Sequence, residues 1–147
     1  MIHTDIDKLD SAIKNKAKAA VDEMNADVTL KNMGVSGVRV IETLRELAVQ
    51  MAYFSRGNMT VDHVRAMYRA AGLYSISDAD AKMPITWTLD SKHLRGRAID
   101  IAPVKGGVVW WGAPKEVWVR MGEIGESNGL AWGGRWKNSD TPHFEVL

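Results

Sequence analysis

"SKHLRGRAIDIAP", residues 91–103, holds the segment that most constrains the fold of this chain. Its second half, from Ala98 to Ala102, has the length and apolar character of a buried strand, yet Asp100 lies in the middle of it. An ionised carboxylate in an apolar strand is unfavourable unless a positive group pairs with it. Ala98 and Ala102 share the face of Asp100 and are small, which leaves room for a metal ion, and His93 precedes Asp100 by seven residues. The stretch therefore predicts a strand that holds a polar site.

The segments around this strand show helical periods and short strand patterns. We expect helices over residues 5–26, 45–57, 60–72 and 114–128, strands over 38–44, 97–103, 108–112 and 143–147, and loops over 32–37, 74–90 and 130–142. Thr60 is a suitable N-cap, and Gly57, Gly72 and Gly129 each end a helical pattern. The chain has no internal repeat and no domain boundary. We predict one α+β domain over residues 1–147, with an N-terminal helix and turn over 1–37 and a core with a small antiparallel sheet over 38–147.

The composition excludes several classes of protein. The 147 residues contain no cysteine, which excludes disulfides, thiolate nucleophiles and cysteine-based zinc sites. A net charge of +1 gives no reason to expect nucleic acid as a partner. No stretch approaches the roughly 20 apolar residues of a membrane helix, and the N-terminus lacks the apolar run of a signal peptide. We expect a monomer that is made in the cytoplasm, does not insert into membranes, and needs another factor to leave the cell.

Two of the four histidines, His93 and His143, lie beside carboxylates. Two imidazole nitrogens and the Asp100 carboxylate would make a three-ligand catalytic zinc set, with a fourth position left for water. The alternatives are ordinary: Asp100 would cap a turn or pair with a nearby arginine, and His63 would lie on a solvated helix face. His3 has the position of a frayed terminus.

A hydrolase of this kind also needs a carboxylate that accepts the proton of water. Asp140 precedes His143 by three residues on a loop, and Glu145 follows His143 by two residues on the same strand face. Spacing alone does not choose between these two carboxylates.

Three blocks of the sequence are similar to a known family. "SKHLRGRAID" resembles the S-x-H-x-x-G-x-A-x-D motif of the M15 zinc peptidases. "GLAWGGRWKNSDTPHFE" resembles the C-terminal signature of the phage endolysin branch, the L-alanyl-D-glutamate peptidases, and "ETLRELAVQMAYFSRG" resembles the E-x-x-R-x-x-x-x-Q segment of that branch. The blocks are in family order and span residues 38–147. The resemblance implies a fold like that of the Hedgehog domain and the D-Ala-D-Ala peptidases.

The resemblance also implies a role for each matching position. His93, Asp100 and His143 would bind Zn²⁺, and Asp140 rather than Glu145 would be the general base. Arg45 would bind a substrate carboxylate or the developing oxyanion, for which its planar guanidinium is suited. Ser91 and Gln50 would line the cleft. Two positions depart from the family pattern: Leu44 replaces an aromatic residue, and Glu46 replaces a serine or threonine.

The implied activity is cleavage of the bond between L-Ala and D-Glu in peptidoglycan by a phage endolysin, which would act in the periplasm after a holin-type release. One alternative is a D-alanyl-D-alanine carboxypeptidase on the same scaffold, and another is a wall-binding domain without catalysis. Asp78 and Asp80 suggest a Ca²⁺ site, but two carboxylates fall short of the six to eight oxygens that Ca²⁺ takes, so a solvated loop is the simpler interpretation.

Overall fold

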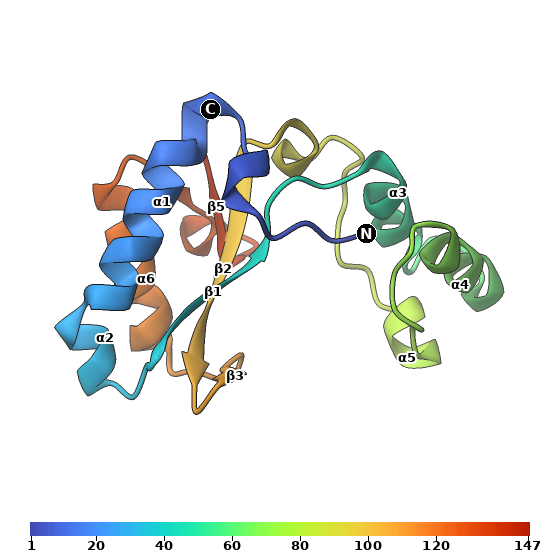
Figure 1. Ribbon diagram of the computed structural model, residues 1–147. Helices are drawn as coiled ribbons and strands as arrows, with labels where there is room; N and C mark the ends of the chain where they lie inside the picture. The colour runs from blue at the N-terminus through green and yellow to red at the C-terminus, as the bar shows by residue number, and fades with distance from the viewer.

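A small antiparallel sheet is built around β2 (Ala98–Lys105) in the computed structural model, which describes residues 1–147 (Figure 1). The other strands are β1 (Gly37–Glu42), β3 (Val108–Val109), β4 (Ala131–Trp132) and β5 (His143–Glu145). Their order is β1-β2-β5-β4, and β3 pairs with the end of β2 as a hairpin. Every pairing is antiparallel, as the sequence predicts for an α+β domain.

β2 separates an apolar core from a polar face. Ile99 and Ile101 are fully buried in the main core, whereas Asp100 between them is only half-buried and lies on the opposite face. The core side is covered by α1 (Ser11–Ala26), α2 (Val28–Asn32) and α6 (Lys115–Ser127), which Figure 1 shows on one side of the sheet. The three helices leave the polar face of β2 free to form a site.

The remaining helices build a second, smaller apolar cluster on the other side of the sheet (Figure 1). These helices are α3 (Leu47–Ser55), α4 (Val61–Ala70) and α5 (Asp78–Ala81). Tyr68 is the largest side chain of the cluster and is buried. The buried Arg56 donates hydrogen bonds to the carbonyl oxygens of Asp80 and Met83, which fixes the end of α5 against α3. Because this cluster faces the polar side of the sheet, a cleft can form between the two parts of the domain.

A β-bulge changes the direction of side chains along β1. Val40 pairs with Ile101, but Glu42 pairs with Asp100, so the register shifts by one residue at Ile41. Val40 and Ile41 both pack against the main core. Strict alternation would direct Glu42 into that core together with Val40, whereas the bulge places Glu42 on the polar face beside Asp100.

The structure confirms the predicted main helices and strands and corrects the boundaries of several. The expected helix over 5–26 is divided: Asp5 caps a 3₁₀ turn, Ile6–Lys8, and Asp10 then caps α1 through a 2.9 Å bond from the Ala12 amide. Two predicted loops contain regular structure, since 74–90 includes α5 and 130–142 includes β4 and the 3₁₀ turn Gly133–Arg135. The sequence does not predict α2, because this helix has only five residues and no amphipathic period of its own.

The N-terminus is held in the fold, contrary to the expectation for His3. The His3 carbonyl accepts a hydrogen bond from the Thr43 amide at 2.7 Å, and His3 Nε2 lies 3.0 Å from Glu46 Oε1. His63 is exposed on α4, as predicted. None of the helices combines the length and the apolar character needed to cross a membrane.

Candidate metal centre and cleft

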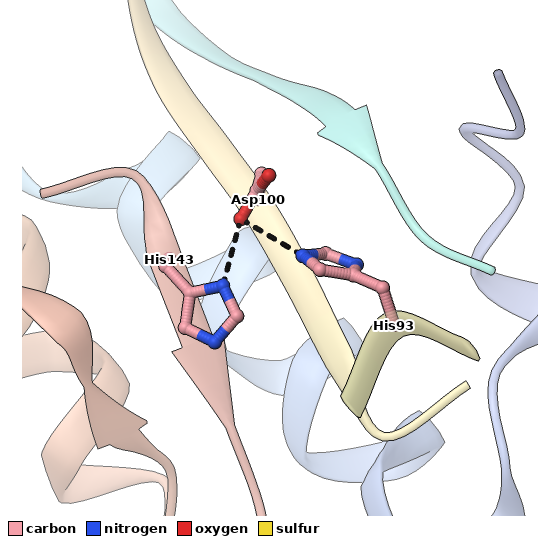
Figure 2. A group of neighbouring side chains, drawn as sticks. All are labelled: His93, Asp100 and His143. Atoms are coloured by element: carbon pink, nitrogen blue, oxygen red, sulfur yellow. Dashed lines mark hydrogen bonds and ion pairs between the residues drawn. The ribbon is translucent and has the colours of Figure 1, made fainter. Parts of the chain in front are cut away.

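Three predicted ligands converge on the polar face of the sheet (Figure 2). Asp100 on β2 pairs directly with His143 on β5, and the 3₁₀ turn Lys92–Arg95 brings His93 to the other side of Asp100. His93 Nε2 and His143 Nδ1 each lie 3.2 Å from Asp100 Oδ1. One ligand atom from each residue lies within 4.8 Å of the others. Both imidazole rings are buried, so the cluster is held by the fold.

Gly96 allows the turn that holds His93 to close. Ser91 caps the turn by accepting a bond from the His93 amide, and Gly96 ends it with a φ of 65°. A Cβ atom at Gly96 would lie 3.0 Å from the backbone nitrogen of Asp10. Glycine is therefore required both by the left-handed conformation and by the approach of the N-terminal segment.

The two imidazole rings are oriented by acceptors on their outer sides. His93 Nδ1 lies 2.8 Å from the Thr43 carbonyl oxygen, and His143 Nε2 lies 3.0 Å from Glu145 Oε1. A carbonyl and a carboxylate only accept, so the ring nitrogens facing them carry the protons. In a neutral imidazole the other nitrogen then presents a lone pair, and both lone pairs point at the Asp100 oxygen. Two nitrogen lone pairs and a carboxylate oxygen that face one another repel each other unless positive charge lies between them. That charge is either protons on the rings or a metal ion.

The charges in the cluster agree with this arrangement. Burial alone would raise the pKa of Asp100, but the bonds to His143 and His93 hold it well below its ordinary value. Burial alone would lower the pKa of His143, but Asp100 raises it. The donor set of two imidazole nitrogens and one carboxylate oxygen fits a divalent cation such as Zn²⁺, and outer acceptors of the kind seen here are typical of metal-binding histidines.

The structure distinguishes the two carboxylates next to His143. Glu145 is engaged on both oxygens, because Oε1 accepts from His143 and Oε2 lies 2.8 Å from Lys92 Nζ. Burial opposes the ionisation of Glu145, but the bonds from Lys92 and His143 lower its pKa. Glu145 is thus a fixed anion that orients His143.

Asp140 lines the same cavity, at its rim. Its backbone is fixed by a 2.9 Å bond from its amide to the Gly133 carbonyl oxygen and a 3.3 Å bond from the His143 amide to its own carbonyl oxygen. Gly133 allows this approach, since a Cβ there would lie 2.5 Å from the Asp140 carbonyl oxygen. Desolvation in the cleft and the charge of Asp100 raise the pKa of Asp140, although the residue keeps contact with solvent.

Arg45 reaches the cavity as part of a buried network. Its Nε and one terminal nitrogen donate to the two oxygens of Glu42, and its other terminal nitrogen donates to Gln50 Oε1 at 2.7 Å. Gln50 Nε2 donates in turn to the Thr88 carbonyl oxygen at 2.7 Å. Gln50 is fully buried and does not line the cavity, contrary to what the family resemblance implies. Glu42 neutralises Arg45 and holds its guanidinium in one orientation.

The cavity around the cluster has a volume of about 530 Å³, in the range of small-molecule sites. Predicted site residues that line it are Arg45, Ser91, His93, Asp100, Asp140 and His143. The sequence alone assigns no role to Glu42, Lys92 or the Thr43 carbonyl. The E-x-x-R spacing could have indicated that Glu42 and Arg45 interact. No sequence pattern indicates that the Thr43 carbonyl oxygen accepts a hydrogen bond from His93. Asp78, considered for Ca²⁺, forms an ion pair with Arg65 instead.

The chain is similar to known proteins in part of its sequence and in its fold. Residues 85–146 match a family model described as D-alanyl-D-alanine carboxypeptidase. Among solved structures, the chain is similar to the L-Ala D-Glu endopeptidase ChiX of Serratia marcescens, with a TM-score of 0.60 and 22% sequence identity over 97% of this chain and 83% of that chain. No curated protein matches the sequence. The resemblance to M15 peptidases and the α+β fold are confirmed, and the comparisons support a peptidase.

Proposed function

We propose that this protein is a zinc-dependent endopeptidase that cleaves the bond between L-Ala and D-Glu in peptidoglycan stem peptides. The observation that carries the proposal is the convergence of His93, Asp100 and His143 in one cavity with Asp140 at its rim. The name printed for the similar Serratia marcescens structure describes this same reaction, and the three sequence blocks resemble the endolysin branch.

His93, Asp100 and His143 are the residues that would hold the metal ion. When bound, a divalent ion supplies positive charge that acidifies a water molecule and polarises the scissile carbonyl. The chain supplies the fixed orientation of the three ligands, through Thr43 for His93 and Glu145 for His143.

Asp140 is the proposed proton carrier. Its carboxylate accepts a proton from the attacking water as the oxygen bonds to the L-Ala carbonyl carbon. The carboxyl group then gives the proton to the D-Glu nitrogen while the carbon–nitrogen bond breaks, so one water is consumed for each bond that is cut. Glu145 cannot take this role without losing its bonds to His143 and Lys92.

Arg45 is the proposed receptor for the α-carboxylate of D-Glu. Its guanidinium has five N–H donors, of which Glu42 and Gln50 occupy three. Two donors remain on a side chain that lines the cavity. The clamp by Glu42 and Gln50 would reduce the conformational entropy lost when the substrate binds.

A D-alanyl-D-alanine carboxypeptidase is the second candidate, because the matching family model has that description. The endopeptidase is favoured because the structural likeness extends over nearly the whole chain rather than over residues 85–146 alone. For the biological setting we propose a phage endolysin that acts as a monomer on the host cell wall in the periplasm, after release by a holin.

The test is mass spectrometry of the fragments released from purified Gram-negative peptidoglycan, with and without a chelator. Stem peptides that begin at D-Glu, with L-Ala left on the muramic acid, are expected, and the chelator should abolish them. Loss of a single terminal D-Ala would instead identify the carboxypeptidase. Binding to the wall without any fragment, by protein loaded with zinc, would contradict both reactions and favour a non-catalytic domain.

A further inference from the structure

A second hollow continues from the metal-site cavity past Asp140. We call it the aromatic groove; it has a volume of about 600 Å³ and is lined by Ile85, Thr86, Trp87, Thr88, Trp136, Asn138, Ser139 and Asp140. Five of these residues also line the cavity around the metal cluster: Ile85, Thr86, Thr88, Trp136 and Asp140. The two hollows therefore form one continuous cleft, with Asp140 at their junction.

Two exposed tryptophans belong to this groove. The exposed fraction is 73% for Trp87 and 43% for Trp136. A tryptophan that enters a core buries roughly 150–250 Å², so two tryptophans that remain in water on one groove indicate a binding surface. Trp111 is also exposed, at 55%, but it lies outside the groove and stacks on the buried Trp118. The exposure of Trp111 is thus accompanied by packing on another aromatic ring, whereas Trp87 packs on no aromatic ring.

Both walls of the groove are fixed relative to the cluster. The segment that carries Trp87 runs from α5 back to the turn of His93 (Figure 1). It is anchored by the bond from Gln50 to the Thr88 carbonyl oxygen, and the Thr88 hydroxyl accepts from the Asp90 amide at 2.9 Å. On the other wall, the rings of Trp136 and His143 have centroids 5.0 Å apart. The groove is thus formed before any ligand binds.

The charge of the groove selects among the parts of the substrate. Its lining contains one acidic residue, Asp140, and no lysine or arginine. The metal-site cavity, in contrast, is lined by charges of both signs: Arg45 and Lys92 lie there with five carboxylates, of which Glu42 and Glu145 pair with these two cations. The stem peptide beyond D-Glu bears carboxylates, and the cleft offers them the two free donors of Arg45 and a metal ion at the cluster, whereas the groove offers them no cation. The groove suits an uncharged group with a flat apolar face and hydroxyl or amide groups at its edge, which the threonine, serine and asparagine side chains can bind.

We propose that the aromatic groove binds the N-acetylmuramoyl sugar of the glycan strand; this inference rests on the proposed function. In the proposed substrate the nitrogen of L-Ala is joined to the lactyl group of that sugar. One residue spans at most about 3.6 Å, so the sugar must lie directly beside the bond that is cut. The aromatic groove adjoins the metal-site cavity at Asp140, and its two exposed tryptophans provide aromatic surface on which a pyranose ring can stack.

The test compares two substrates that differ only in the sugar: an L-Ala–D-Glu stem peptide acetylated on L-Ala, and the same peptide bearing N-acetylmuramic acid. The measured quantity is the ratio of kcat/KM for the two substrates. The wild-type enzyme should prefer the muramoyl peptide, and Trp87→Ala should reduce this preference by about tenfold, as expected for loss of an aromatic anchor. Trp111→Ala is the matched control and should keep the wild-type ratio.

A second readout separates this proposal from the proposed reaction. The affinity of the zinc-loaded protein for N-acetylmuramoyl-L-Ala, measured by calorimetry, should fall in Trp87→Ala and not in Trp111→Ala. Equal kcat/KM values for the two substrates in the wild type, or an equal loss with both substrates in Trp87→Ala, would overturn the sugar site. If neither substrate is cut but the affinity for N-acetylmuramoyl-L-Ala still depends on Trp87, the proposed reaction is wrong and the sugar site stands. If neither substrate is cut and the affinity does not depend on Trp87, both the reaction and the sugar site are wrong.

Discussion

Individual hydrogen bonds separate the roles of the two carboxylates near His143, Asp140 and Glu145. Glu145 is bonded on both oxygens, whereas Asp140 lines the cavity without such bonds. We predict that Asp140→Asn lowers kcat by about 10²- to 10⁴-fold with unchanged zinc affinity, because only proton transfer is lost.

Glu145→Gln should weaken zinc binding by about 10- to 100-fold, because the acceptor that orients His143 loses its charge.

Zinc affinity is measured by competition with a chromophoric chelator, and turnover is measured at saturating zinc. Lys92→Gln is a useful companion variant, since it removes the ion pair to Glu145 and leaves the carboxylate in place. It should weaken zinc binding less than Glu145→Gln does. An Asp140→Asn enzyme with normal turnover would exclude Asp140 as the proton carrier.

The residues of the metal cluster can be predicted from the sequence, whereas the roles of their neighbours depend on the folded chain. The cluster of His93, Asp100 and His143 can be predicted because two histidines and an aspartate within an apolar strand, in this motif spacing, are typical of a zinc site. The choice between Asp140 and Glu145 needs the family resemblance, because both lie within three residues of His143. Their different surroundings depend on Lys92, which is distant from Glu145 in sequence and bonded to it only in the folded chain.

At the scale of the element, α2 and α6 are joined by Asp27. Its side chain caps α2 through a 2.9 Å bond from the Leu30 amide and also accepts from Arg120 on α6 at 2.7 Å. We predict that Asp27→Ala lowers the free energy of unfolding by about 1–2 kcal/mol, as for other lost N-caps. Asp27→Asn, which can still cap, should lower it by less than about 1 kcal/mol, because it removes only the ion pair.

These differences should depend on pH in a defined direction. The bond from Arg120 lowers the pKa of Asp27 in the folded chain, so its charge stabilises the fold fully above the unfolded pKa of about 3.9. That contribution is lost as the pH falls through the lower folded value. Urea unfolding at pH 7 and near pH 3 should therefore show a smaller difference between wild type and Asp27→Asn in acid. A difference that grows in acid would contradict the assignment.

Elements with their own local signals can be predicted well. α4 is expected over 60–72 and spans Val61–Ala70, because Thr60 caps it and its apolar residues recur with a helical period. α2, α5 and β4 have five residues or fewer, so tertiary contacts rather than local patterns decide them. β4, for example, forms because Ala131 and Trp132 pair with β5.

At the scale of the whole molecule, the ligand cluster connects segments that are far apart in the chain. The turn of His93, β2 and β5 must all be in place before the three ligand atoms meet, so a metal ion binds the folded chain more tightly than the unfolded chain. We predict that chelation lowers Tm by about 5–10 °C, which corresponds to zinc at roughly 100 times its Kd. Added zinc should restore the original value.

Scanning calorimetry with and without chelator measures this shift. Asp100→Asn is the control, because it lacks the central ligand and its Tm should not respond to zinc. An identical Tm for zinc-loaded and chelated wild-type protein would argue against a metal site formed by this cluster.

The bulge at Ile41 means that β1 consists of two short strands in opposite phase. Before Ile41 the even-numbered residues face the core, and after it an even-numbered residue, Glu42, faces the cleft. A strand that kept all its residues but lost the bulge would turn the carboxylate of Glu42 toward Ile99 and Ile101, whereas deletion of Ile41 would leave Glu42 opposite Asp100, on the cleft face. An insertion of two residues would preserve the phase. The position of Glu42 in the cleft thus depends on one extra residue in β1, Ile41, which has no partner on β2.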